Sequence, residues 1–382
     1  LMPSLNPHAT AQLVPIARRR VRIGNTAVLK RLRAIQHSRL PPPARLLVEV
    51  AATAARPLEM TEVADAVGVD AAQDAFIAGC DSGLLEPAEH SARFVHELVR
   101  KACYADLTEP RRRWLHGLIA GVLTRRPAPA APAEVARHLR LSGDDASARP
   151  YLIAAAQKAT ALGALDEAAD FLTEALDCGD PAPVEIAELW LSLGEIESWR
   201  ERRDAMDAAF TRAIALLEVE GQTVAVAAAY VARGHQLRTG LCYPRESLSA
   251  YRRALELIDS GHLDAPAVRA LALAGAAWAG AMAGGGACVQ GLIEQVEALP
   301  EAEGDAVLAV ELDFARVAAL IRSGRLEEVD VPGNRAIDTA ARLRRADLLH
   351  LACANVACAA SCRGDFERVL TLAERALSGP VS

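Results

Sequence analysis

Aromatic residues are scarce in this sequence. Phe, Trp and Tyr make up 4% of its 382 residues, although hydrophobic residues make up 52%. The cores of β-sandwiches and β-barrels are usually built from aromatic and β-branched residues, and runs of those are rare here. Alanine supplies much of the apolar content instead, and it favours helices that pack closely. The composition therefore predicts an all-α fold.

Paired cysteines and a complete helical zinc motif are also missing. The eight cysteines form no CxxC pair, and no secretory signal precedes them, which is typical of reduced residues in a cytoplasmic protein. His96 and Glu97 resemble the opening of a zinc-protease helix, but residue 100, where the second His is needed, is Arg. Three cysteines lie close in sequence but would spread round a helix: Cys353, Cys358 and Cys362. We predict no metal site, with a cluster of these three cysteines as the alternative.

Acidic residues are absent from the first 48 positions, which are strongly basic. The basic residues there are Arg18, Arg19, Arg20, Arg22, Lys30, Arg31, Arg33, Arg39 and Arg45. The whole chain nevertheless carries a net charge of −7, which argues against nucleic-acid binding because neutralising phosphates requires an excess of Lys and Arg. We interpret the basic segment as a solvated arm, or as a helix that pairs with an acidic surface.

Long hydrophobic runs are limited to one uncharged stretch, residues 270–293. It is long enough to span a bilayer, but Ala and Gly contribute little transfer free energy. The three glycines at 284–286 would also break a helix in its middle. We therefore predict a buried helix, a glycine turn and the start of another helix, and no membrane contact.

The second part of the sequence repeats. One segment matches the tetratricopeptide (TPR) pattern at its most diagnostic positions: Trp190, Leu193, Gly194, Phe210 and Ala213. The alanine that closes the second helix of a repeat recurs at 175, 213, 254, 298, 336 and 376, with spacings of 38 to 44 residues, and the unit at 298 is the least regular. Turn glycines at 163, 324 and 364 fit the same period. The pattern predicts a TPR-like α-solenoid, whose groove suits binding better than catalysis, with a generic bundle of α-hairpins as the alternative.

The first part predicts a winged-helix-like domain. A helix at about 43–55 precedes a short helix that Thr61 caps and Gly68 ends, a second helix from Asp70 to Asp81, and two short strands that would form a β-wing. The second helix would be the recognition helix of a DNA-binding domain, yet it carries Asp70, Asp74 and Asp81 and no Lys or Arg. Because these carboxylates would repel phosphates, we expect contacts with protein and no direct contact with nucleic acid.

These observations predict four regions. Residues 1–42 form the basic N-terminal segment, and residues 43–125 form the winged-helix-like domain. Residues 126–134, rich in Pro and Ala, are a linker, and residues 135–382 form the TPR-like repeats.

Nearly the whole chain resembles one protein family. The stretches "VLKRLRAIQHSRLPPPARLLVEVAA" and "ARFVHELVRKACYADLTEPRRRWLHGLIAGVL", with the alanine-rich repeats behind them, are similar to the middle of large bacterial STAND-type ATPase transcriptional regulators. The similar group is the LuxR-like one that includes the maltose regulator. The resemblance implies that a nucleotide-binding domain precedes the winged helix, so that the basic segment is the end of a missing ATPase module. It also implies that a superhelical sensor follows, and that a DNA-binding domain often ends such a protein.

The resemblance also suggests a role for His96. "FVHELVR" is similar to the "MHDLLR" motif of these ATPases, whose His contacts the phosphates of bound ADP and holds the resting state closed. Glu97 would occupy the acidic position, and Val95 replaces the Met. The alternative is a His that only caps or packs at a junction between strand and helix. The sequence contains no GxxxxGK[ST] phosphate loop, so we expect no cofactor in this chain, and ATP or ADP only in a full-length protein.

We therefore expect a regulatory or sensor segment and no enzyme. The helical repeats would bind an effector, either a small molecule or a partner protein, through residues that the sequence does not identify, and the winged helix would relay the nucleotide state. The alternatives are a freestanding TPR adaptor or scaffold and the accessory region of a nucleotide cyclase. No catalytic residue is predicted, because a thiol site built from His96, Cys103 and His116 would lack an orienting acid.

Overall fold

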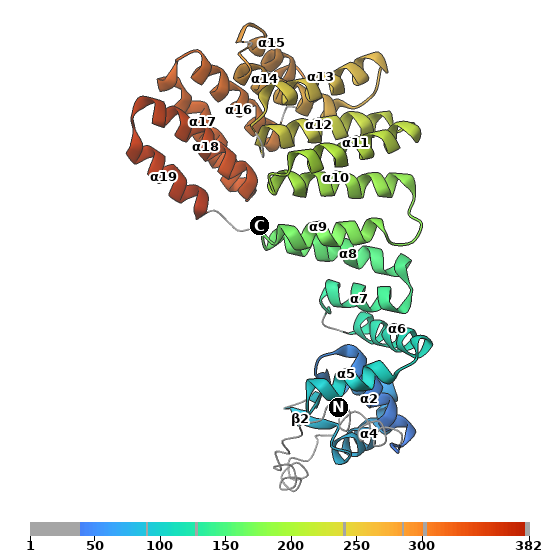
Figure 1. Cartoon of the computed structure of the whole chain (residues 1–382). Coiled ribbons are helices and arrows are strands. Elements are labelled where there is room, and N and C mark those ends of the chain that lie inside the picture. Colours follow the sequence, from blue (N-terminus) through green and yellow to red (C-terminus); the bar gives the residue numbers. More distant parts are fainter. Residues whose placement is uncertain are drawn as a thin grey trace. The chain divides into compact units, whose positions relative to one another are not determined.

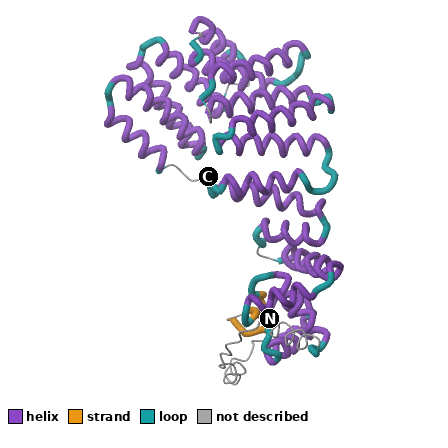
Figure 2. Tube along the Cα trace, viewed as in Figure 1, coloured by secondary structure: helices purple, strands orange, loops and turns teal. Residues whose placement is uncertain are grey.

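The computed structural model describes residues 39–88, 91–126, 129–239, 242–284, 286–300 and 304–378, with the side chains of 286–288 left out. Contacts divide the chain after Asp144 into two compact units, called here unit 1 and unit 2. Helices dominate both, and the only strands among the described residues belong to unit 1 (Figure 2). The all-α prediction is confirmed. Most of the basic segment (1–38) and two residues of the predicted linker (127–128) lie outside the described residues.

Unit 1 combines helices with a small antiparallel sheet. Its elements are α2 (Pro42–Ala54), β1 (Leu58–Glu59), α3 (Met60–Val67), α4 (Val69–Asp81), β2 (Leu85–Ala88), β3 (Ser91–Phe94), α5 (Glu97–Asp106), α6 (Glu109–Arg125) and α7 (Pro132–Ser142). The strand order is β1-β3-β2, with β3 antiparallel to both neighbours. From α2 to β3 the helices and strands follow the order predicted from the sequence, with β2 and β3 as the two short strands. That this order forms a winged-helix-like domain stays a prediction.

The start of α3 differs from the prediction. Thr61 was expected to cap this helix, but it lies inside it, and Glu59 is the N-cap. The reason is that β1 runs directly into the helix, so the last extended residue is Glu59. Its backbone N–H donates to the Glu62 carboxylate over 2.9 Å, as in a capping box. The predicted end at Gly68 is confirmed, with a φ of +95° that suits glycine.

The core of unit 1 forms around α2, which contacts α4, α5 and α6. Its apolar residues Leu47, Val48 and Ala51 are at most 1% exposed. Glu49, also buried, accepts hydrogen bonds of 2.6 and 2.8 Å from the Arg111 guanidinium of α6. A buried carboxylate needs such a partner, so this ion pair fixes α6 against α2.

Unit 2 is a stack of helical hairpins (Figure 1). Its described elements are α8 (Asp145–Ala161), α9 (Leu165–Leu176), α10 (Pro183–Trp199), α11 (Arg203–Val219), α12 (Thr223–Thr239), α13 (Pro244–Ser260), α14 (Pro266–Met282), α15 (Gly286–Glu297), α16 (Ala306–Arg322), the short 3₁₀ helix η2 (Leu326–Val329), α17 (Asp330–Leu343), α18 (Ala346–Arg363) and α19 (Phe366–Leu377). The TPR-like solenoid predicted from the sequence is confirmed.

Small residues hold these hairpins together. The repeat alanines Ala175, Ala213, Ala254 and Ala336 are each at most 1% exposed, so neighbouring helices approach closely at these points. The predicted turn at Gly163 has a φ of +73°, which a residue with a Cβ adopts only at a cost. The positive φ at the turn and the small side chains at the helix contacts therefore agree with the sequence pattern.

One hairpin, α14–α15, departs from the pattern. Ala298 was expected at the close contact of its second helix, but it lies beyond the end of α15 and is exposed. The buried positions of α15 are Val289, Ile293 and Val296, which are larger and β-branched. The repeat period therefore continues through this hairpin, but the close contact does not.

The uncharged stretch forms helix α14, as predicted. Its residues from Ala272 to Ala279 are buried in the core of unit 2, where they meet α13, α15 and α16. Among the described residues, no helix has the length and hydropathy needed to cross a membrane.

Candidate effector-binding site

His96 lies at the junction between β3 and α5, where it is the N-cap of the helix. Its imidazole Nδ1 accepts a hydrogen bond of 3.1 Å from the backbone N–H of Leu98. The side chain is exposed, and Nε2 makes no hydrogen bond among the described residues. Capping satisfies one of the free N–H groups of the helix. It leaves one ring nitrogen available, so the geometry accommodates both roles that the sequence suggested for this residue.

The residues next to His96 fix the start of α5. Arg100, which occupies the position of the second zinc ligand, forms hydrogen bonds of 2.7 and 2.8 Å with the Glu97 carboxylate. Another N–H of Arg100 donates to the carbonyl of Ala52 in α2 over 2.7 Å. Glu97 and Arg100 thus bind the helix that His96 caps to the core helix α2. Among the residues that the structure describes, no group of His, Cys, Asp and Glu could hold a metal ion.

Two other histidines form a buried pair in unit 1. His116 of α6 and His138 of α7 are at most 2% exposed, and their Nδ1 atoms are 2.8 Å apart. Arg137 can only donate, so the Nε2 of His138 accepts its N–H over 2.9 Å. The proton of His138 is therefore on Nδ1, and His116 carries its own on Nε2, 3.0 Å from the Tyr104 hydroxyl.

This arrangement requires both imidazoles to be neutral. Burial, with a contribution from Arg137, lowers the pKa of His116 to about 4 and that of His138 to about 3. His116 therefore faces His138 and Tyr104, and Cys103 is buried in α5. We assign no catalytic role to this pair, and the absence of a catalytic residue from the chain stays a prediction.

The helix α4 presents acid at its surface. Asp70, Asp74 and Asp81 are all exposed on it. This helix follows α3 in the position of a recognition helix, and its exposed carboxylates would meet the phosphates of DNA. That this segment makes no direct contact with nucleic acid stays a prediction.

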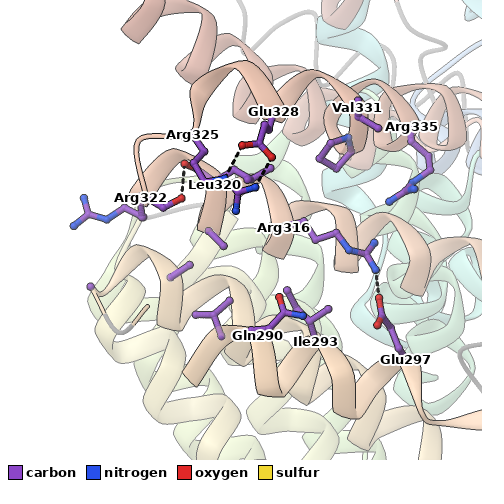
Figure 3. Close-up of a pocket in the computed structure, with 16 residues that line it drawn as sticks. Gln290, Ile293, Glu297, Arg316, Leu320, Arg322, Arg325, Glu328, Val331 and Arg335 are labelled. Atoms are coloured by element: carbon purple, nitrogen blue, oxygen red, sulfur yellow. Dashed lines mark hydrogen bonds and ion pairs between the residues drawn. The ribbon is translucent and has the colours of Figure 1, made fainter. Parts of the chain in front are cut away.

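A pocket of about 700 Å³ lies in unit 2, where α15 stands beside α16 and the start of α17 (Figure 3). Its apolar lining comes from Ala281, Val289, Ile293, Ala319, Leu320, Val331 and Pro332. α15 packs mainly on α14 and makes little contact with α16. The pocket therefore occupies space that closer packing of α15 would fill, at the hairpin whose predicted alanine contact is missing.

The polar side of this pocket is rich in arginine. Its charged lining residues are Glu297, Arg316, Arg322, Arg325, Glu328 and Arg335, which sum to two positive charges. Arg316 and Arg335 both bind the carboxylate of Asp313, which is 2% exposed, with distances of 2.8 Å from Arg316 Nη1 and 2.7 Å from Arg335 Nε. A buried carboxylate that holds two guanidinium groups fixes their orientation.

Two carboxylates at the pocket meet arginines as well. Glu297, the last residue of α15, forms an ion pair with Arg316, and Glu328 forms one with Arg325 (Figure 3). Arg322 has no side-chain partner among the described residues and is exposed at the rim. The lining contains one Ser and neither His nor Cys, so it offers charge and apolar surface but no nucleophile with a neighbouring base.

A fully buried ion pair lies elsewhere in unit 2. The Arg238 guanidinium of α12 binds the Glu311 carboxylate of α16 through hydrogen bonds of 2.6 and 2.8 Å, and both residues are less than 10% exposed. Burial opposes ionisation of Glu311, but Arg238 holds the pKa of this carboxyl below its usual value. His235 Nδ1 accepts another Arg238 N–H over 3.0 Å. This pair joins two helices that are separated by a whole hairpin in sequence.

The pocket residues were not identified from the sequence. Arginines on helices are usually solvated, and neither their spacing nor their number distinguishes Arg316 or Arg335 from the others. One signal was present, because the unit around 298 was the least regular of the repeats. A repeat that loses its small contact residue is where an array of helices is expected to leave space.

Comparisons with known proteins found matches among solved structures. No known protein family matches the sequence, and no curated protein does. Among solved structures, the chain is similar to a signal transduction ATPase with numerous domains (STAND) that has a tetratricopeptide repeat sensor, from Pyrococcus horikoshii. The TM-score is 0.35 and the sequence identity 13%, over 94% of this chain and 65% of that one. This chain thus spans about two thirds of the length of that protein.

Proposed function

We propose that this chain is the sensor segment of a STAND-type ATPase transcriptional regulator of the LuxR-like group. In this proposal the helical repeats bind an effector in the pocket beside α15, and unit 1 relays the nucleotide state of an ATPase module in a full-length protein in the cytoplasm. The observation that carries it is the pocket itself, a space of about 700 Å³ with an apolar floor and an arginine-rich side. Pockets of this size and character are typical of sites for small molecules.

Binding without turnover fits the lining best. A hydrolytic or group-transfer site needs a nucleophile with a base in reach, or a metal with an open position. Ser323 is exposed at the pocket, and its hydroxyl donates over 3.1 Å to the carbonyl of Leu320 in its own helix. We therefore assign no catalytic role to this chain, and ATP or ADP would belong to the ATPase module.

The effector role can be tested by hydrogen exchange on the full chain. Small molecules below about 1 kDa, the size that a site of this kind holds, are extracted from cells, fractionated and added. We expect one fraction to slow exchange in α16 and α17. Leu320→Trp should abolish that effect by filling the pocket, whereas Leu271→Trp, at an exposed position of α14, should not. If no fraction changes exchange there, or if Leu320→Trp responds like the wild-type chain, the pocket is no effector site.

The relay role can be tested at His96. A nucleotide-binding module is restored in front of the chain, and the rate of ADP release is measured. Asn is a good N-cap, so His96→Asn keeps the cap of α5, whereas His96→Ala loses it. If the imidazole contacts the ADP phosphates, both variants should release ADP faster, and the exposed control Lys101→Gln should not. Faster release by His96→Ala alone would leave His96 with the capping role only.

A second candidate function, a TPR adaptor for a partner protein, is favoured by the outer face of α19. Phe366, Leu370 and Leu377 are 67%, 66% and 84% exposed, and their spacing places them on one side of the helix. An apolar stripe of this kind is the type of surface on which another helix packs. Leu320→Trp distinguishes the two functions, because a TPR adaptor that uses α19 would bind its partner protein as tightly after this substitution as before it.

A further inference from the structure

We propose that the pocket beside α15 binds an organic anion with an apolar body, and that the carboxylate or phosphate of this ligand displaces Glu297 from Arg316. The proposal rests on the proposed function, in which this pocket is the effector site, and it adds the chemical class of the effector and the contact that the effector breaks. The parts that carry it are the fixed arginines, the exchangeable carboxylate and the apolar floor.

The guanidinium of Arg316 is fixed in an orientation that suits an anion. One side of its guanidinium donates to Asp313 over 2.8 Å, and Asp313 is buried and also bound by Arg335. The opposite Nη2 points across the pocket to Glu297 (Figure 3). Since a guanidinium carries five donors in a fixed plane, fixing one side determines where an acceptor must sit on the other. That second position lies at the pocket.

Glu297 occupies this position as an internal carboxylate. It is 47% exposed at the C-terminal end of α15, and Arg316 is its only hydrogen-bond partner within the described parts of the chain. Replacing this carboxylate with that of a ligand exchanges one charge-assisted hydrogen bond for another, so the exchange itself costs little. Glu297 returns to water, which solvates a free carboxylate well. The ligand gains by burying its apolar part against Ile293 and Leu320.

The remaining charges favour an anion as well. Glu328 is already neutralised by Arg325, and Arg335 keeps its contact with Asp313. Arg322 at the rim has no side-chain partner among the described residues, so its positive charge also favours an anion. An amine would meet these arginines as a like charge, and a neutral alcohol would leave Glu297 in place. The site therefore discriminates by the charge of the head group.

Displacement of Glu297 has a structural consequence. The ion pair with Arg316 is the only side-chain polar link between α15 and other elements that the described residues form. A ligand anion on Arg316 thus releases the C-terminal end of α15 while its apolar body rests on the middle of the helix. Effector binding and the hold on α15 are linked because both need the same guanidinium.

The test uses the full chain and four probes that share an eight-carbon tail: octanoate, octyl phosphate, octan-1-ol and octylamine. Affinity is measured by isothermal titration calorimetry. We expect the anions to bind and the alcohol and amine to bind at least about tenfold more weakly, as expected for the loss of one charge-assisted hydrogen bond. Octanoate binding more tightly than octyl phosphate would identify a carboxylate as the head group, and the reverse order would identify a phosphate.

Variants distinguish the displacement of Glu297 from a simple attraction of the anion to arginine. Glu297→Gln removes the competing carboxylate and should tighten anion binding by about tenfold, an increase that misfolding cannot imitate. Arg316→Gln should weaken it by a similar factor, and Arg253→Gln, on an exposed arginine of α13, should leave it unchanged. Binding of octanoate should also speed hydrogen exchange at residues 294–300, where Glu297 holds the helix end.

Failure of this inference and failure of the proposed function give different results. If octan-1-ol binds in the pocket as tightly as the anions, the anion class is wrong. If Glu297→Gln does not tighten binding, the displacement of Glu297 is wrong. In both cases the pocket remains an effector site. If none of the four probes binds, the proposal that the ligand is an organic anion is also wrong. The effector role itself is lost only if, in addition, no cell fraction changes exchange in α16 and α17.

Discussion

The hairpins α10–α11 and α14–α15 use the same means of close packing but differ in result. In the first, Gly194 leaves room for the Phe210 ring, since a Cβ at residue 194 would lie 2.9 Å from two ring carbons, and Ala213 of the second helix is fully buried. In the second, Gly275 leaves room for the Tyr251 ring of the preceding hairpin, where a Cβ would lie 2.3 Å from the nearest ring carbon. Among the described side chains of the second helix (289–297), however, there is no buried alanine, and a pocket opens beside this helix.

The difference between the two hairpins indicates where a helical array can leave room for a ligand. Gly194 admits a ring from its own hairpin, and Gly275 admits one from the preceding hairpin, so the stack continues through the irregular hairpin. Among the side chains of α15 that the structure describes, no alanine holds the helix against its neighbours. One relaxed contact is enough to produce a pocket of about 700 Å³ without breaking the stack. The irregular hairpin is also crossed by the buried ion pair of Arg238 and Glu311, which joins α12 and α16 on either side of it.

Among the variants that test this comparison, the largest loss of stability should come from breaking the ion pair of Arg238 and Glu311. Arg238→Met leaves the Glu311 carboxylate buried without a partner, which should lower the free energy of unfolding by about 3–5 kcal/mol in urea denaturation. The double variant Arg238→Met/Glu311→Met removes both charges and should recover most of that loss, because an apolar pair of similar volume is often tolerated. If the single variant costs less than about 1 kcal/mol, a fraction of the penalty for a stranded charge, the pair does not hold the hairpin in place.

The next effect should come from the regular hairpin. Gly194→Ala pushes a methyl group into the Phe210 ring, which should cost about 1–3 kcal/mol as overpacking. The control is Gly280→Ala in α14, where an added Cβ would lie 3.8 Å from Val289, an ordinary contact. This control should be neutral or stabilising by up to about 1 kcal/mol through helix propensity. Equal losses in both variants would mean that close approach is no special feature of the regular hairpin.

Much of this fold could be predicted because the signals are local. A turn glycine such as Gly163 and a repeat alanine such as Ala213 act within one hairpin, so their spacing alone predicts the array. The order of helices and short strands in unit 1 follows from Gly68 and the strand residues for the same reason. The cap of α3 was missed because it depends on how β1 enters the helix, and Thr61 is only two residues away from Glu59.

The candidate site could not be predicted in the same way. It depends on Asp313 being buried between Arg316 and Arg335, and on Glu297 reaching Arg316 from a different helix. These contacts join residues whose partners are set by the tilt of α15, which periodicity does not determine. The role of His96 remains a prediction for a related reason, since the nucleotide that it would contact belongs to another domain.

The irregular region should also respond to acid through His235. Burial, with a contribution from Arg238, lowers the pKa of His235 from 6.5 to about 4. Because the unfolded chain then binds more protons, His235 adds stability above pH 6.5 that is lost as the pH falls towards 4. Arg238, Glu311, Arg345 and Asp347 are the charged groups that act on it.

This pH dependence is measured as a difference between two chains. Urea denaturation of the wild type and of His235→Gln at pH 7.5 and pH 4.5 should show a smaller acid loss in the variant, by on the order of 2 kcal/mol. The comparison cancels the other groups that titrate in this range. If both chains lose the same free energy, His235 is not held neutral by its surroundings, and the ion pair behind the irregular hairpin is more accessible to water than the structure implies.

The smallest effect should come from α15 itself. Gly291 is exposed in the middle of this helix, and an added Cβ would meet nothing within 4 Å. Gly291→Ala should therefore stabilise the helix by about 0.5–1 kcal/mol and slow its hydrogen exchange, because alanine loses less backbone freedom on folding. The same variant should leave octanoate binding unchanged, since Gly291 does not line the pocket. A loss of stability would mean that α15 lies against a neighbour on this side too, and α15 would then be as closely packed as the helices of the regular hairpin.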